Sequence, residues 1–169
     1  VLFRSKGVKR VIYRVFLEGD LRKAQAESAD SGTGGGARDL RLRPHSEFGD
    51  IFERIFPGRR VQRQKRGGTY EDVTILCGRF SWMDGSTVKS AEAEYWPPTF
   101  ARPGEGRVAK IYNYPPLTRV PPPNEGKLLV LIVQDANDQV WPYIVTEDSL
   151  RTGDWDAKVS GPILECLDA

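Results

Sequence analysis

The chain has little of the chemistry that metal sites and disulfide frameworks require. Among its 169 residues are one histidine, His45, and two cysteines, Cys77 and Cys166, which lie far apart and belong to no metal-ligand spacing. We therefore expect neither a zinc site nor a disulfide framework, and the cysteine usage favours a reducing, intracellular setting. No apolar run is long enough to span a membrane. Neither sign of charge dominates, because 25 basic residues stand against 23 acidic ones, so net charge by itself indicates no partner.

Glycine and proline, in contrast, are abundant. The 17 glycines and 12 prolines separate short segments with strand character, and only one segment is convincingly helical. This pattern predicts a mainly β fold with one or two helices. Val1 to Ser5 match the in-frame translation of a common sequencing-library adapter, so we exclude them from fold reasoning. We expect residues 6–169 to form a single domain, as the C-terminal part of a longer protein.

Charge is distributed unevenly along the chain. Basic residues cluster at Lys6 to Arg14, Arg38 to Arg43 and Arg59 to Arg66, whereas acidic residues dominate Glu147 to Asp156. Such asymmetry is typical of a protein with one cationic face. A set of solvated loops would produce the same composition, so charge alone leaves both interpretations open.

The first half of the chain contains the clearest helix. Val8 to Leu17 and Arg38 to Arg43 alternate as strands do, and a polar loop ending in the glycines of 31–36 separates them. After Pro44 comes a predicted helix, capped by Ser46 and stopped by Pro57-Gly58. Its core stripe consists of Phe48, Ile51, Phe52, Ile55 and Phe56.

The second half has the pattern of successive strands. Arg59 to Arg66 is expected to be a basic connection that leads into the next strand. Strands are predicted at Tyr70 to Trp82, Thr87 to Trp96, Arg107 to Tyr114, Lys127 to Gln134 and Gln139 to Val145. The last two form a hairpin around residues 135–138, and residues 147–150 open a short helix.

Two loop motifs carry a family resemblance. Residues 29–44 read A-D-S-G-T-G-G-G-A-R-D-L-R-L-R-P, the helix ends in I-F-P-G, and residues 101–111 read A-R-P-G-E-G-R-V-A-K-I. In this order the chain resembles the amino-terminal effector domain of EcoRII-type restriction endonucleases. That family has an N-D-x-G-x-T-G-G-H-Q loop and a T-R-N-E-K-R-I-T-R run. The matching positions are Asp30, Gly32, Gly35, Gly36, Pro44, Phe56-Pro57, Arg102, Glu105 and Arg107.

The resemblance implies a seven-stranded DNA-binding pseudobarrel, a fold shared with plant auxin-response transcription factors. Two loop arms of that fold enter the major groove, and here they would be Ser31 to Arg41 and Pro97 to Lys110. The family's histidine-glutamine pair is Ala37-Arg38 in this chain, and the second arm carries Pro103 and two extra glycines. Because those positions read bases in the family, the family's target sequence is not carried over.

The two arms offer the side chains that read base edges. Arginine can bind guanine O6 and N7 with two hydrogen bonds, and a carboxylate can accept from cytosine N4. The expected DNA-binding residues are Arg38, Asp39 and Arg41 on the first arm and Arg102, Glu105, Arg107 and Lys110 on the second. The alternative is that these residues form surface ion pairs.

Basic residues outside the arms are expected to contact phosphates. Arg59, Arg60, Arg63 and Lys65 would position the duplex without reading its sequence, unless their segment is only a solvated loop. Tyr95 and Trp96 would either stack on a flipped base or seal the barrel mouth, and we favour the second role.

The sequence offers no convincing catalytic set. His45 has no recognisable serine or cysteine partner, Cys77 lies in an apolar strand, and the glycine loop lacks the lysine and hydroxyl of a P-loop. The best nuclease-like fragment is Asp154-x-Asp156-Ala-Lys158, with Asp135 or Asp138 as a distant acid that would help to hold magnesium.

We therefore expect a non-enzymatic chain that requires no cofactor or metal. Its predicted function is sequence-specific binding of double-stranded DNA in the major groove, as a targeting or effector module of a restriction or defence system. A nuclease domain in the same or another chain would be its partner, and the cytoplasm its location. The alternatives are a metal-dependent DNA nuclease and a transcription regulator with the same fold.

Overall fold

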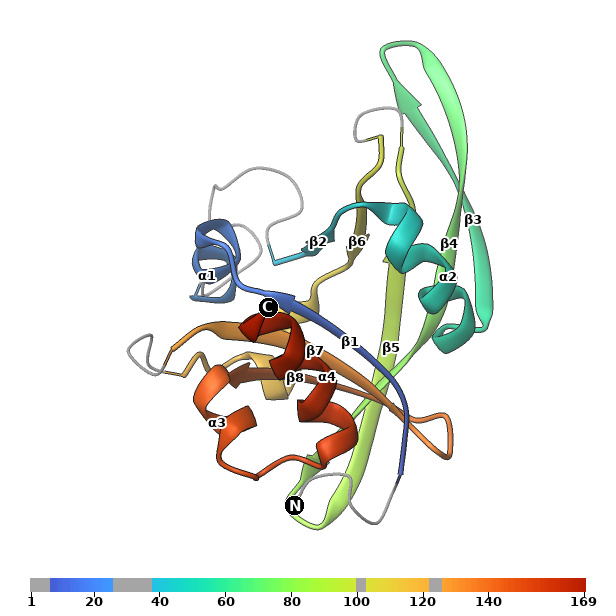
Figure 1. Ribbon diagram of the computed structural model, residues 1–169. Helices are drawn as coiled ribbons and strands as arrows, with labels where there is room; N and C mark the ends of the chain where they lie inside the picture. The colour runs from blue at the N-terminus through green and yellow to red at the C-terminus, as the bar shows by residue number, and fades with distance from the viewer. Residues whose placement is uncertain (1–6, 26–37, 100–102, 122–125) are drawn as a thin grey trace.

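The computed structural model describes residues 7–25, 38–99, 103–121 and 126–169. Within these ranges the chain is mainly β, with eight strands in two antiparallel sheets and four α-helices (Figure 1). One sheet has the order β1-β7-β8 and the other β2-β6-β5-β4-β3. The mainly β prediction is confirmed, but the helices are more numerous than predicted. The described strands do not close into a barrel.

The three-stranded sheet is covered on both faces. It consists of β1 (Val8–Val15), β7 (Leu128–Asp135) and β8 (Val140–Thr146). Leu129, Leu131 and Val133 face a cluster built with α3 (Glu147–Arg151) and α4 (Ala157–Asp168). Val130 and Ile132 face the main core. Every residue of β7 is therefore buried, which explains its continuous apolar run.

The five-stranded sheet is built around one long strand. β4 (Thr69–Asp84) pairs through its first half with β3 (Gly58–Arg66) and through its second half with β5 (Thr87–Trp96). The two resulting hairpins project from opposite ends of the molecule (Figure 1). The short strands β2 (Leu40–Leu42) and β6 (Gly106–Val108) complete the sheet beside β5.

Helix α2 (His45–Ile55) lies against this sheet, as its apolar stripe predicted. Phe52 is fully buried and stacks on Tyr95 of β5 with ring centroids 4.2 Å apart. The His45 Nδ1 atom lies 2.8 Å from the Tyr95 hydroxyl, which ties the first turn of the helix to the same strand. The N-cap is Pro44, without a side-chain cap, so the predicted capping by Ser46 is wrong.

Four further expectations differ from the structure. Residues 18–25, predicted as part of a loop, form α1 (Glu18–Gln25), in which Asp20 accepts a hydrogen bond from the Leu17 amide as in a capping box. The basic segment after α2 is strand β3 rather than a connection. The strand expected at 107–114 ends at Val108 and gives way to 3-10 turns at Ile111–Asn113 and Pro115–Leu117. Helix α4 was not predicted, since Pro162 interrupts its pattern.

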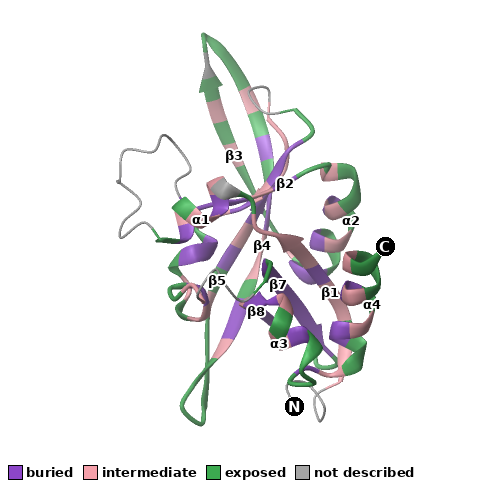
Figure 2. Ribbon diagram, turned by 60° about the vertical axis from the view of Figure 1, so that its left-hand side comes forward, coloured by how far each residue is buried: buried purple, intermediate pink, exposed green. Residues whose placement is uncertain are grey.

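Burial separates a continuous interior from the projecting hairpins (Figure 2). Buried residues concentrate where the two sheets and α2 meet, whereas the tips of the β3–β4 and β4–β5 hairpins are exposed. The large side chains buried in the main core include Tyr95, Tyr112, Phe52, Phe56 and Phe80.

Candidate nucleic-acid interface

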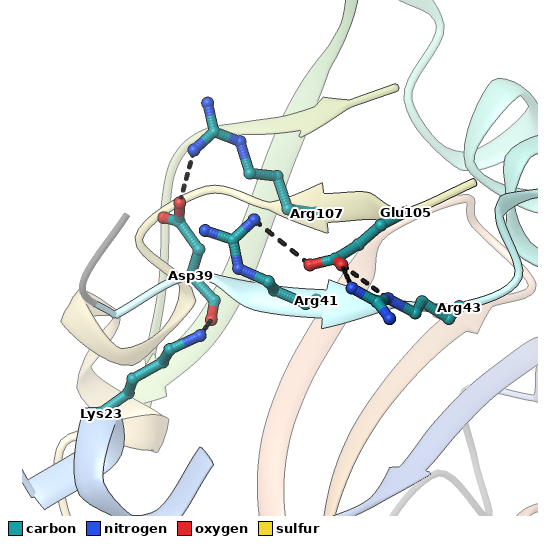
Figure 3. A network of polar contacts seen from close by, with 6 residues as sticks. All are labelled: Lys23, Asp39, Arg41, Arg43, Glu105 and Arg107. Atoms are coloured by element: carbon teal, nitrogen blue, oxygen red, sulfur yellow. Dashed lines mark hydrogen bonds and ion pairs between the residues drawn. The ribbon is translucent and has the colours of Figure 1, made fainter. Parts of the chain in front are cut away.

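Strands β2 and β6 bring the two predicted arm segments side by side. Arg41 lies directly opposite Arg107 in the antiparallel pair, and Leu40 lies opposite Val108. Because strand residues alternate between faces, Leu40 and Val108 point into the core while Arg41 and Arg107 share the other face. Asp39 and Arg43 flank Arg41 at the same two-residue spacing. One face of the sheet therefore carries three arginines and two acidic residues from these neighbouring segments, namely Asp39, Arg41, Arg43, Glu105 and Arg107 (Figure 3).

Glu105 is the buried centre of one half of this network. Only 3% of its side chain is exposed; it forms an ion pair with Arg41 at 3.3 Å and accepts a hydrogen bond from the Arg43 Nε atom at 2.6 Å. A second Arg43 nitrogen, Nη2, donates to the same Glu105 oxygen. A buried carboxylate requires such partners, because its desolvation would otherwise cost more than the fold can supply.

Asp39 has the same role in the other half. Its carboxylate accepts from Arg107 Nη1 at 2.9 Å and from the Lys110 backbone amide at 2.7 Å. The Asp39 carbonyl accepts from Lys23 of α1 at 3.3 Å. Burial lowers the pKa of the Lys23 ammonium, and the nearby carboxylates of Asp20 and Asp39 oppose this shift. We name the set Asp39, Arg41, Arg43, Glu105 and Arg107 the arginine ladder.

The basic side chains of the ladder are more exposed than its acidic side chains. The exposed fraction of the side chain is 77% for Arg43, 28% for Arg107 and 17% for Arg41, whereas Asp39 and Glu105 are buried. The carboxylates are thus engaged with arginines inside the protein. They fix the guanidinium groups in position, and the arginines present the polar surface.

An aromatic side chain extends the ladder across the sheet. Trp96 is the cross-strand partner of Arg107, whose guanidinium lies 4.7 Å from the centroid of the indole ring. The Arg60 guanidinium lies 5.9 Å from the same ring and forms an ion pair with Glu94 at 2.7 Å. Cations over an aromatic face are attracted by its quadrupole, so Arg107, Trp96 and Arg60 form one row on a single face of the sheet.

The predicted phosphate contacts do not share one face. All four side chains are exposed. In the pairing of β3 with β4, Arg60 lies opposite Ile75 and Arg63 lies opposite Asp72. Arg60 and Arg63 are three positions apart on β3, and residues an odd number of positions apart on a strand point to opposite faces. Arg59, Arg63 and Lys65 therefore point away from the face that carries Arg60. On that other side Arg63 and Lys65 lie over the Tyr70 ring, at 4.3 and 5.5 Å from its centroid. The four predicted phosphate contacts are therefore divided between the two faces of β3.

The remaining predicted arm residues have different environments. Arg38 is buried with a positive φ of 80°, and its Nη2 atom donates to the Tyr112 carbonyl. Lys110 is exposed, with a φ of 51°. Arg102 and most of the first arm, residues 31–37, lie outside the described residues.

Sequence reasoning missed three residues of this region. Arg43, Arg14 and Lys23 were not among the predicted contacts, although Arg43 continues the two-residue spacing of Asp39 and Arg41. Tyr95 and Trp96, the two aromatic residues considered for base stacking, are buried. Tyr95 packs in the core and Trp96 lies beneath two arginines, and the described strands close no barrel whose mouth these rings would seal.

The residues of the nuclease-like fragment have structural partners. Asp156 is the N-cap of α4 and accepts from the Lys158 amide at 2.8 Å. Asp135 accepts from Trp141 Nε1 and from the amides of Asn137 and Gln139 at the turn of its hairpin. Among the described residues, no group of three or more histidine, cysteine, aspartate or glutamate side chains is placed to hold a metal ion.

Comparison with known proteins adds no assignment: no protein-family model, curated protein or solved structure matches the chain. In the ranges that the structure describes, every helix is too short or too polar to cross a membrane.

Proposed function

We propose that the chain binds double-stranded DNA through the arginine ladder and reads its sequence in the major groove. The single observation that carries the proposal is the pairing of Arg41 with Arg107, each of which is held by a buried carboxylate from the neighbouring strand or its extension. Fixed guanidinium groups suit two-point recognition of guanine, because little side-chain freedom is lost on binding.

The other cations position the duplex in this proposal. Arg43 is the most exposed member of the ladder, and Arg60 continues the row on the same face. Arg59, Arg63 and Lys65 stand on the reverse side of the projecting β3–β4 hairpin, where they can follow a phosphate backbone that passes the hairpin. Such contacts supply affinity without sequence information. Arg38, Asp39 and Glu105 are positioning residues, since their side chains are buried.

The biological role follows the family resemblance. The seven-stranded pseudobarrel is proposed on the same basis, and a targeting or effector module of a restriction or defence system would pass its DNA to a nuclease domain. The same DNA-binding chemistry would also serve a transcription regulator. A nuclease partner would distinguish the restriction or defence role from that alternative. No arrangement in the described residues favours the nuclease alternative.

Selection of bound duplexes from a random library tests the proposal directly. We expect a short enriched motif, and an affinity that falls steeply with salt because several phosphates are neutralised. Lys89→Ala serves as the control, since Lys89 lies in the other hairpin and pairs only with exposed Asp84 among the described contacts. Enrichment of no motif, or equal affinity for single strands, would contradict the proposal.

A further inference from the structure

A pocket shares Arg41, Arg43 and Glu105 with the arginine ladder, and its other lining residues are not explained by DNA binding. It has a volume of about 590 Å³ and is formed where β1, α1, β2 and α2 meet. Four of the side chains that line it are cationic, namely Arg14, Lys23, Arg41 and Arg43. Two are acidic, Asp20 and Glu105, and both are buried.

The acids do not satisfy all of the cations. Asp20 accepts from Arg14 Nη2 at 2.6 Å and from the Leu17 amide at 2.8 Å. The other terminal nitrogen, Arg14 Nη1, is buried and has no hydrogen-bond partner among the described residues. Lys23 donates only to a backbone carbonyl in the described contacts, and burial lowers the pKa of its ammonium group. A buried donor without an acceptor costs free energy that a bound anion would recover.

The rest of the wall is apolar. Leu17 is 63% exposed although it is a large aliphatic residue, and Phe48 of α2 and Val15 of β1 line the pocket beside it. A bare inorganic anion would fill only a small part of this volume and would contact none of these side chains. The geometry therefore calls for a ligand that combines an anionic end with an apolar or aromatic body.

We propose that this pocket binds a nucleoside phosphate, with the phosphate at Arg14 and Lys23 and the remainder against Leu17 and Phe48. A phosphate is favoured over a carboxylate because cations from three elements converge, and a tetrahedral group with several oxygens can accept from all of them. The same chemistry is available from a free mononucleotide and from a nucleotide unit of bound DNA.

Binding in the pocket is coupled to the arginine ladder, and this step rests on the proposed DNA-binding function. Arg41 and Arg43 line the pocket and also hold Glu105. An anion in the pocket competes with Glu105 for both arginines, and therefore weakens the ion pairs that hold their guanidinium groups in position. A bound free nucleotide thus lowers the affinity for DNA, and by linkage DNA lowers the affinity for the nucleotide to the same degree.

Calorimetric titration of the DNA-free protein tests the pocket alone. We expect a nucleoside 5′-monophosphate to bind about tenfold more tightly than inorganic phosphate, because only the nucleotide contacts Leu17 and Phe48. Arg14→Gln should weaken nucleotide binding by about tenfold or more. Since Arg14 also pairs with buried Asp20 and its loss can impair folding, Leu17→Glu is the second variant. Leu17 is exposed, so the change leaves the fold intact and places a negative charge at the pocket mouth.

The matched control and the DNA arm separate the outcomes. Arg79→Gln, which removes a cation that lies outside the pocket, should leave nucleotide affinity unchanged. If the free nucleotide does not bind but duplex affinity falls with both Arg14→Gln and Leu17→Glu, the source is a nucleotide unit of DNA and the pocket assignment stands. The assignment is overturned if neither variant changes the affinity for either ligand. Failure to shift DNA while the nucleotide still binds would contradict only the proposed function.

Discussion

Arg41 and Arg107 lie directly opposite each other on β2 and β6, and each is held by a different buried carboxylate. Arg41 pairs with Glu105, and Arg107 pairs with Asp39. Asp39 precedes β2 and Glu105 precedes β6, so each arginine forms its ion pair with a carboxylate from the neighbouring strand's segment. This arrangement fixes two guanidinium groups side by side.

Arg107→Lys should relax sequence choice while the protein stays folded. Lysine keeps a positive charge near Asp39 but cannot form the two parallel hydrogen bonds that a guanidinium makes to guanine. We expect a loss of about 1 to 3 kcal/mol of discrimination at one or two positions of the selected motif. Library selection with the variant measures the effect, and a motif identical to that of the parent protein would remove Arg107 from the reading surface.

Arg63→Ala should weaken binding to every duplex by the same factor. Arg63 is exposed and lies on the reverse side of the hairpin, over Tyr70, so we assign it to a phosphate. The slope of log affinity against log salt should fall by about one. Titrations of one preferred and one scrambled duplex at several salt concentrations provide the test. A loss confined to the preferred duplex would assign Arg63 to base reading instead.

Glu105→Gln should reduce stability rather than redirect recognition. Its carboxylate is buried and holds Arg41 and Arg43, so loss of the charge weakens two charge-assisted contacts, at a cost of about 1 to 3 kcal/mol. Urea unfolding measures this change. Glu94→Gln is the matched control, because that side chain is more exposed and its ion pair contributes at most about 1 kcal/mol. An unchanged midpoint together with an altered base preference would show that Glu105 contacts DNA directly.

Gly106→Ala should destabilise the junction between β6 and the core. A Cβ atom at this position would collide with the Tyr95 hydroxyl and with its ring, and Tyr95 is itself stacked on Phe52. Overpacking of this kind typically costs about 1 to 3 kcal/mol. Gly161→Ala in α4 is the control, since a Cβ there meets nothing within 4 Å. That change should raise the midpoint of thermal unfolding, because alanine is the better helix former.

Stability should fall at alkaline pH as Tyr114 ionises. Burial, together with the nearby carboxylates of Glu94 and Glu92, raises the pKa of the Tyr114 phenol from 10.0 to about 12. Because the folded-state pKa is above the unfolded value, the stabilisation is complete below pH 10 and is lost as the pH rises from about 10 to 12. Unfolding midpoints of the parent protein and of Tyr114→Phe, compared across this window, provide the measurement. The variant should show the smaller decline, and parallel curves would exclude Tyr114 as a cause.

Local patterns were sufficient for several elements of the fold. The stripe of α2, the apolar run of β7 and its hairpin with β8 were all predicted, since each depends on the spacing of neighbouring residues. The β3 strand was missed because arginines and glutamines occupy both of its sides, which leaves no apolar alternation to detect. Helix α1 was missed for a similar reason, since its few buried positions lie among polar residues.

The sequence by itself determined which residue types the candidate interface contains: charged residues that alternate with leucines at residues 38–43, and a basic, acid-containing run near Glu105 and Arg107. Only the tertiary structure decided which of them remain accessible. Arg43 and Glu105 are 62 residues apart in the chain, and their contact exists because β2 and β6 pair at the end of a sheet that five strands complete. Pairing across such a distance depends on the whole core, and burial then turns the acidic residues inward to hold the arginines. No local pattern contains that information.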